Sequence, residues 1–353
     1  MPPKAKDKDN SREALRALKA DLKAGTLGKL YVLHGEEAYL RAYYLREIEK
    51  ALLPAGLEDF NLHTAQGRDC TAEWLEQAVD CLPMMSERTL VEVTDFDLFD
   101  GGEGQRSKLL TLLGQLPDYC CVVFVYDLLP YKADGRSKLA ALLKEWGSVV
   151  NFARQEQGDL TDWIVRRFRA AGHTIDTEDA RYLIFLCGDL MTNLISEIGK
   201  IAAYAKARRV TREDIDAVAV PQMEAVVFRM TDAMARRDFD RAALVLADLL
   251  HDQQPPIMIL AVMGKYLRQL YSARLFLDAG RDREAFMDMW AMRHSYQADR
   301  ILDAAAKFSL PWCRHAVRRC AETDLAMKSG GGDPQELLIA LLLELSAGRK
   351  VIV

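Results

Sequence analysis

The sequence lacks several features that would point to particular classes of protein. Its 353 residues carry a formal net charge of −5, so the chain as a whole is not a basic nucleic-acid coat, and any contact with nucleic acid would come from local patches. No apolar run is long enough to span a bilayer, and the stretch Met1–Lys8 has no apolar core of the kind found in a signal peptide. We therefore expect a cytoplasmic chain without a membrane partner, beginning with a polar tail.

Metal-binding and catalytic motifs are also missing. The seven cysteines include no CxxC pair, whereas zinc ligation needs ligands at close, convergent spacing. The cysteines are predicted to be buried thiols of a cytosolic protein. The histidines are scattered without an HExxH motif, and no GxSxG is present. The sequence thus offers no catalytic residue, no metal site and no cofactor site.

What is present first is an alternation of strands and helices between residues 11 and 155. Short apolar segments predict strands at residues 29–34, 60–64, 89–93, 120–126 and 148–152. The uninterrupted apolar run at 120–126 is typical of a central parallel strand covered on both faces, and 148–152 is predicted to be an edge strand. Helical patterns lie between the strands. They fall at residues 36–53, 108–116 and 139–146, and at a helix capped by Thr71 with Trp74, Leu75, Ala78 and Leu82 on its apolar face. Repeated units of this length imply an α/β domain with a parallel sheet and helices on both sides.

After Gln157–Asp159 only helical periodicity remains. We predict three domains: an α/β domain at 1–155, a small helical domain at 156–221 and an all-α domain at 222–353. In the second, Thr211 is expected to cap a short helix whose first turn is acidic. In the third, Pro255 and Pro256 begin a long helix to about Leu277 that is apolar on two sides and suited to packing against other helices.

A parallel sheet followed by helical domains suggests a nucleotide hydrolase, but the first strand–helix turn argues against it. A phosphate-binding loop reads GxxxxGK[ST], because backbone amides hold the phosphates and the lysine neutralises them. Here Gly35 is followed by Glu36 and Glu37, whose charges repel phosphate. Asp127, after the central strand, is the only acid at the place of a magnesium-binding pair. The glycine-rich stretch Gly101–Gly104 is predicted to be a flexible loop. We expect a binding protein built on a nucleotide-binding scaffold that has lost the nucleotide.

The most informative segment is Leu82-Pro83-Met84-Met85-Ser86-Glu87-Arg88, directly before the strand at Thr89. Loops are usually polar, and two adjacent methionines at such a place are unusual. Methionine is flexible and polarizable, so the pair can fill a gap in the core of the chain, or it can insert into the pocket of a partner. Both possibilities remain open from the residues of this segment alone.

Six segments, taken in their order and spacing, carry a family resemblance. They are Leu30–Leu40, Leu82–Arg88, Leu160–Ile164, Ile215–Val218, Val227–Ala233 and Asp324–Gly330. The chain resembles the delta subunit of the bacterial DNA polymerase III clamp loader from Leu30 to about Leu345. No single segment is decisive, but their succession over all three predicted domains makes the match specific.

The resemblance implies a non-catalytic subunit of a DNA-directed DNA polymerase holoenzyme. Its first domain would be AAA+-like, without a phosphate loop. This domain would bind the ring-shaped sliding clamp (beta) and open it for loading on primed DNA. Its last domain would form a collar with the gamma or tau and delta prime subunits. By position, the clamp-binding residues would be Leu82, Pro83, Met84 and Met85. The family more often has leucine or an aromatic side chain where the two methionines stand here.

The resemblance also implies primer–template DNA as a partner within the complex. Basic side chains would contact phosphates. The candidates are Arg41, Arg46, Arg136, Lys138, Lys144, Arg166, Arg167 and Arg169.

Two other functions compete with clamp binding. One is an active AAA+ ATPase with a degenerate phosphate loop, which a nucleotide titration would reveal. The other is a scaffold subunit that binds loader subunits but not the clamp. Exposed side chains at Met84 and Met85 would favour a partner site over a scaffold, and buried ones would favour the scaffold.

Overall fold

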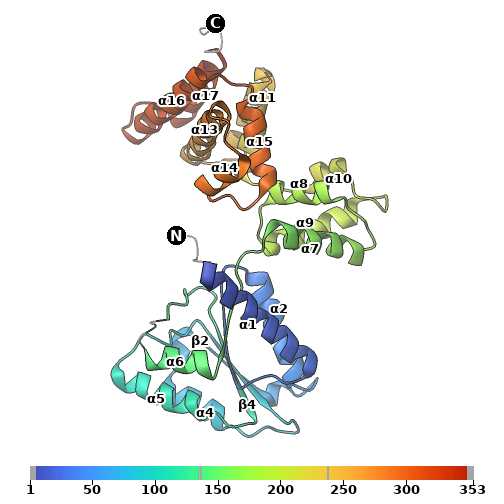
Figure 1. The fold of residues 1–353 in the computed structure, drawn as a ribbon, viewed down its shortest axis with the longest axis vertical. Coiled ribbons are helices and arrows are strands. Elements are labelled where there is room, and N and C mark those ends of the chain that lie inside the picture. Colours follow the sequence, from blue (N-terminus) through green and yellow to red (C-terminus); the bar gives the residue numbers. More distant parts are fainter. Residues whose placement is uncertain (1–4, 134, 136, 237, 348–353) are drawn as a thin grey trace. The chain divides into compact units, whose positions relative to one another are not determined.

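The structure is a computed structural model that describes residues 5–133, 135, 137–236 and 238–347. The chain divides into two compact units (Figure 1). The first extends to Gln155 and also includes Leu190–Thr192, and the second holds Glu156–Asp189 and the residues from Asn193 onward. The further division of the second unit at residue 221 stays a prediction.

The first unit is built on a five-stranded sheet. The strands are β1 (Leu30–His34), β2 (Leu62–Gln66), β3 (Thr89–Thr94), β4 (Cys120–Val125) and β5 (Ser148–Asn151). All pair in parallel in the order β2-β3-β4-β1-β5, with β5 at one edge as predicted. Every residue of β4 is buried, because it lies in the centre of a sheet that is covered on both faces. The predicted fold class, an α/β parallel-sheet domain followed by an all-helical region, is confirmed.

Helices cover the two faces of the sheet, and side chains that alternate along each strand meet them (Figure 1). On β4, Val122 and Phe124 pack with α4 (Ala72–Asp80), α5 (Glu103–Gly114) and α6 (Lys138–Glu145). The intervening Cys121 and Val123 pack on the other face with α1 (Ala5–Ala24) and α2 (Ala38–Leu52). Two separate apolar cores result, one on each side of the sheet.

Several local predictions for the first unit were wrong. The strand predicted at 60–64 begins only at Leu62, because α3 (Glu58–Asn61) comes directly before it. The glycine-rich stretch predicted as a loop is already helical from Glu103. The predicted polar tail is helical from Ala5 in its second half, whereas residues 1–4 lie outside the described residues. A short 3-10 turn, Gly67–Asp69, follows β2.

The second unit begins with four helices. They are α7 (Gln157–Ala170), α8 (Thr177–Cys187), α9 (Met191–Tyr204) and α10 (Arg212–Val218). Thr211 caps α10 as predicted, and Asp214 completes a reciprocal capping box with it. Among the described residues, no single helix is long and apolar enough to cross a membrane. Only α8 and α9 together pass by length and composition, and they are bent by 119° at their break.

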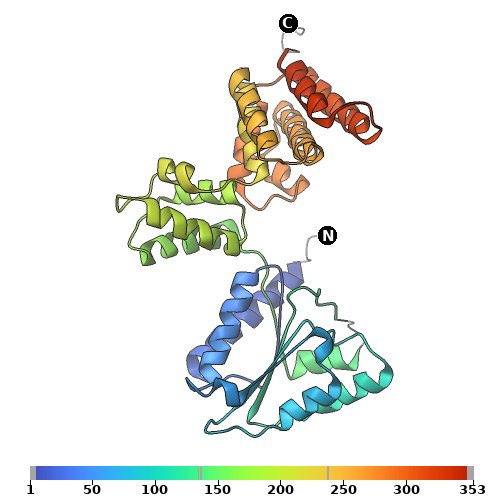
Figure 2. The same cartoon turned by 180° about the vertical axis from the view of Figure 1, so that it is seen from behind.

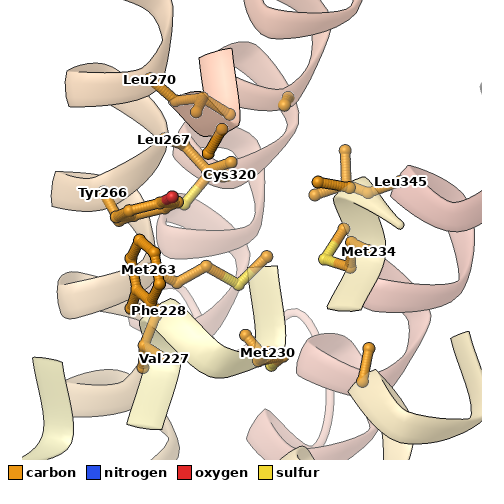
Figure 3. Packing of buried hydrophobic residues seen from close by; sticks show 14 of the residues in the cluster. Val227, Phe228, Met230, Met234, Met263, Tyr266, Leu267, Leu270, Cys320 and Leu345 are labelled. Carbon is orange, nitrogen blue, oxygen red and sulfur yellow. The ribbon is translucent and has the colours of Figure 1, made fainter. Parts of the chain in front are cut away.

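Seven further helices follow, drawn from yellow-green to red in Figure 2. They are α11 (Met223–Ala235), α12 (Phe239–His251), α13 (Pro256–Asp278), α14 (Arg283–Met289), α15 (Ser295–Ala305), α16 (Leu310–Lys328) and α17 (Pro334–Ala347). Their apolar side chains form one core. Figure 3 shows Met263, Leu267 and Leu270 of α13 in that core, with Phe228 of α11 and Cys320 of α16 close by.

The long helix α13 starts at Pro256 as predicted and ends at Asp278, one residue beyond the predicted end. It packs against α16 on one side and α15 on another, so its two apolar sides serve the core of its own unit. Leu275, in the last turn of α13, is exposed, because it lies beyond the core. A role for α13 in contacting neighbouring subunits is therefore not needed to explain its composition.

Candidate functional site

The loop between α4 and β3, residues 81–88, presents three large apolar side chains to solvent. Met85 is 84% exposed, Leu82 74% and Met84 52%, and Pro83 is half-buried. Leu82 was predicted to lie on the buried face of the preceding helix. It does not, because α4 ends at Asp80 and the chain turns extended at Cys81. All four predicted clamp-binding residues therefore lie in the loop, and three of them point large apolar groups outward.

The loop is held from behind by Asn61, a fully buried residue at the end of α3. The Asn61 Oδ1 atom accepts a hydrogen bond of 2.8 Å from the Met84 backbone N–H. Its Nδ2 atom donates to the Met84 carbonyl oxygen and to the Leu57 carbonyl oxygen, both at 3.0 Å. The amide side chain thus fixes both backbone polar groups of Met84 and leaves its side chain outside.

A second anchor lies at the end of the loop. The Arg88 guanidinium donates to the carbonyl oxygens of Leu27 and Gly28, each at 2.7 Å. The Ser86 hydroxyl donates to the Arg88 carbonyl oxygen at 3.0 Å, which closes the turn locally. Met85 has a φ of +52°, a left-handed conformation that a residue without compensating contacts rarely adopts. The loop is a defined structure held at Met84 and Arg88.

Neither anchor could be found from the sequence. Asn61 falls in a stretch predicted as a strand, 23 positions before Met84, and Arg88 contacts residues about 60 positions away. A buried asparagine directly before a strand carries no distinguishing signal, because asparagine is common at the ends of elements. The methionine pair itself could be singled out, since two large apolar residues in a loop contradict the usual polarity of loops, but its outward orientation could not be predicted from these residues alone.

The turn between β1 and α2, where a phosphate loop would lie, is closed by the chain itself. A Cβ atom on Gly35 (φ +118°) would lie 2.5 Å from both Asn151 Oδ1 and the Phe152 carbonyl oxygen. Glu37 is buried, its N–H donates to the Phe152 carbonyl oxygen at 2.8 Å, and its Oε2 accepts from the Met191 N–H at 3.4 Å. These contacts fill the turn with protein groups.

Arg41 adds charge to the same region. It is buried, donates to the Gly35 carbonyl oxygen at 2.5 Å and forms an ion pair with Asp127. Asp127, the single acid considered for metal binding, is thus neutralised by an arginine. Within the ranges that the structure describes, no three His, Cys, Asp or Glu side chains are grouped closely enough to hold a metal ion. Burial and the nearby Arg41 charge lower the pKa of His34 to about 4.

The basic residues considered for DNA contact differ in their surroundings. Arg41 is excluded, because it is buried in the ion pair just described. Arg167 stacks over the Trp163 ring at 5.5 Å. Arg136 lies outside the described residues. The exposed candidates are Arg46, Lys138, Lys144, Arg166 and Arg169.

The predicted burial of the cysteines is confirmed for six of them, and burial raises the pKa of Cys70 to about 12. For Cys81 the prediction was wrong. This residue is exposed, because it follows the last residue of α4 at the start of the loop.

The fold and the closed turn define an α/β parallel-sheet domain without a phosphate loop, joined to an all-helical region. Comparison with known proteins identifies the family. A family model described as "DNA polymerase III, delta subunit" matches residues 31–153, and one described as "DNA polymerase III delta subunit, C-terminal domain" matches residues 224–345. The chain therefore belongs to the family of DNA polymerase III delta subunits.

Individual relatives agree with this family. DNA polymerase III subunit delta of Bacillus subtilis (strain 168) is 27% identical over 334 residues, 92% of this chain and 94% of the relative. The probable subunit delta of Aquifex aeolicus (strain VF5) is 22% identical over 276 residues, 76% of this chain and 77% of the relative. The solved structure of the Bacillus subtilis DNA clamp loader delta protein matches with a TM-score of 0.57 and 24% identity. That match covers 94% of this chain and 98% of the other.

Proposed function

We propose that this chain is a non-catalytic subunit of a clamp loader that binds the sliding clamp and opens its ring for loading on primed DNA. The apolar side chains of Leu82, Met84 and Met85, with Pro83, would insert into a hydrophobic pocket on the clamp. The observation that carries the proposal is the outward exposure of these side chains on a loop whose backbone is held by buried hydrogen bonds.

The alternative roles for the methionine pair fit this geometry less well. A pair that filled a gap in the chain's own core would be buried, and a pure scaffold subunit would have no reason to keep about half or more of each side chain in solvent. Methionine is unbranched and polarizable, so it can repack inside a pocket of imperfect fit. Burying each side chain is worth roughly 1.5–3 kcal/mol.

Ring opening follows if the loop binds the open clamp better than the closed one. A ligand shifts a conformational equilibrium only by its difference in affinity for the two states. The closed turn at Gly35 and the Arg41–Asp127 ion pair leave no phosphate-binding loop in this domain, so the energy of nucleotide hydrolysis would come from neighbouring subunits. The polymerase activity belongs to the holoenzyme of which such a subunit is part.

The remaining partners are assigned to other parts of the chain. The helices from α11 to α17 would join the gamma or tau and delta prime subunits as the collar. Their surface includes exposed Leu325 on α16 and Ile339 and Leu343 on α17. Primer–template DNA would contact some of the exposed basic residues named above. The complex would work in the cytoplasm, where the chromosome is replicated.

Ring opening can be tested with the isolated full-length chain and the cognate clamp. A closed clamp on circular DNA cannot leave without opening, so its release from the DNA reports opening directly. We expect the wild-type chain alone, without ATP, to bind the clamp and to speed its release. If the chain binds no clamp, the proposed function fails, and if it binds the clamp without speeding release, the opening step fails.

A further inference from the structure

We infer that Asn61 is a positioning residue for clamp binding: its buried side chain holds the loop in the binding conformation before the clamp arrives. This inference rests on the proposed function. Asn61 lies behind the loop and is fully buried, so it does not touch a partner that contacts the outward side chains. Any effect on clamp binding would act through Met84, whose backbone N–H and carbonyl oxygen both bond to it.

The topology explains why this position can control the loop. Asn61 is the last residue of α3 and precedes β2, and β2 pairs with β3, with Leu62 opposite Leu90. The loop leads into β3, so Asn61 and Met84 lie near the N-terminal ends of two neighbouring parallel strands. The third hydrogen bond of Asn61, to the Leu57 carbonyl oxygen, fixes the amide group itself within α3. Asn61 therefore ties the middle of the loop to the end of α3, directly before β2.

Holding the loop matters because its conformation is not one that the chain would adopt unaided. Met85 lies in the left-handed region, and both flanking contacts, at Met84 and Arg88, are to groups outside the loop. A loop released from Asn61 would sample other conformations, and clamp binding would then have to restore order at an entropic cost. A loop that is already ordered can therefore present its two flexible methionine side chains to the clamp without this entropic cost.

The test uses the full-length chain and its cognate clamp, with three variants. Asn61→Ala removes all three hydrogen bonds. Asn61→Asp keeps the size and the acceptor for the Met84 N–H but places a carboxylate oxygen against the carbonyl oxygens of Leu57 and Met84. Glu87→Ala changes an exposed side chain of the same loop and is the matched control. The readouts are the clamp dissociation constant and hydrogen exchange of the Met84 amide.

We expect Asn61→Ala to weaken clamp binding about tenfold, which corresponds to the loss of the two hydrogen bonds to Met84. It should also speed hydrogen exchange of the Met84 amide. Asn61→Asp should change both readouts in the same direction and at least as much, because a carboxylate oxygen then faces two carbonyl oxygens at a fully buried position. Glu87→Ala should change neither. Unchanged clamp affinity together with faster exchange at Met84 would overturn the inference.

A thermodynamic cycle separates positioning from general destabilisation. In a chain that already carries Met84→Ala and Met85→Ala, Asn61→Ala should cost little further affinity, because the side chains that it positions are gone. A full additional tenfold loss there would overturn the inference.

Should Asn61→Ala fail to fold, Arg88→Gln provides the test, since it removes the other anchor at a half-buried position. It should weaken clamp binding and speed exchange at Met84, and wild-type affinity for this variant would overturn the inference. In every arm the wild-type chain must bind the clamp. If it does not, the proposed function has failed and not the role of Asn61.

Discussion

At the scale of single residues, the candidate site combines an exposed apolar pair with a buried polar support. Exposed methionines cost a free protein little, because a few scattered apolar side chains on a surface are common. A loop that lost its order would not present them together. Asn61 and Arg88 hold the loop in one conformation through hydrogen bonds to backbone atoms. These bonds do not depend on which side chains the loop presents.

His34 makes the stability of the first unit depend on pH. Burial and Arg41 lower its pKa from 6.5 to about 4, so between these values the unfolded chain binds a proton that the folded chain does not. Stability therefore rises with pH across this window and is lost as pH falls from about 6.5 toward 4. Urea unfolding of wild type and His34→Gln at pH 7 and pH 5 measures the effect. We expect the loss on acidification to be smaller in His34→Gln, and equal losses in the two proteins would contradict this origin.

The methionine pair could be singled out from sequence, because it breaks the polarity expected of a loop, but the structure was needed to show that its side chains are exposed. The Arg41–Asp127 ion pair could not, since its members lie 86 positions apart and each also fits another role, in DNA contact or in metal binding. Asn61 escaped prediction for the same reason. A contact between distant residues leaves no local pattern, whereas an exposed apolar pair does.

At the scale of secondary-structure elements, the β1–α2 turn decides whether the first unit can use nucleotide. Its backbone is packed against Phe152, with no room for a side chain at Gly35, and it carries Glu36 and Glu37 in place of the lysine of a phosphate loop. We expect the isolated chain neither to bind nor to hydrolyse ATP. Isothermal calorimetry with ATP and magnesium, together with a phosphate-release assay, measures this. Micromolar affinity with turnover that is lost on changing Glu36 and Glu37 would show that the turn is a working nucleotide site.

Strands and helices with strong periodicity could be predicted, and β1, β3, β4 and β5 lie within a residue of the expected places. Errors occurred where a short element interrupts a pattern. Phe60 has the apolar, aromatic character of a strand residue, but α3 places it outside the sheet, half-exposed next to Asn61. The apolar face of α4 was extended too far, to Leu82, because a helical pattern does not by itself show where the helix ends.

At the scale of the whole molecule, the candidate clamp-binding loop lies in the first compact unit, and the helices proposed to join other loader subunits, α11 to α17, lie in the second. The cores of the first unit and the core formed by α11 to α17 share no residues, so each region has its own apolar interior. We expect a fragment ending near Val220 to bind the clamp but not to enter the loader complex. A fragment from about Gln222 onward should associate with loader subunits and ignore the clamp.

Size-exclusion chromatography of each fragment with the clamp, and with the other loader subunits, tests this division. The full-length chain is the control for both associations. Co-elution of the C-terminal fragment with the clamp alone would contradict the division, as would entry of the N-terminal fragment into the loader complex.

The most direct measurement is an equilibrium titration of the full-length chain with the cognate clamp, comparing Met84→Ala/Met85→Ala with Leu128→Ala. Leu128 is a fair control because it is 83% exposed. It lies on the loop after β4, at the C-terminal ends of the parallel strands, whereas the methionine pair lies at their N-terminal ends. The Asp95 carboxylate accepts three backbone N–H groups of this loop. We expect the double variant to stay folded and to bind at least about tenfold more weakly, and Leu128→Ala to bind as wild type does. Wild-type affinity in the double variant, its unfolding, or an equal loss in Leu128→Ala would contradict the assignment of the methionine pair as the clamp anchor.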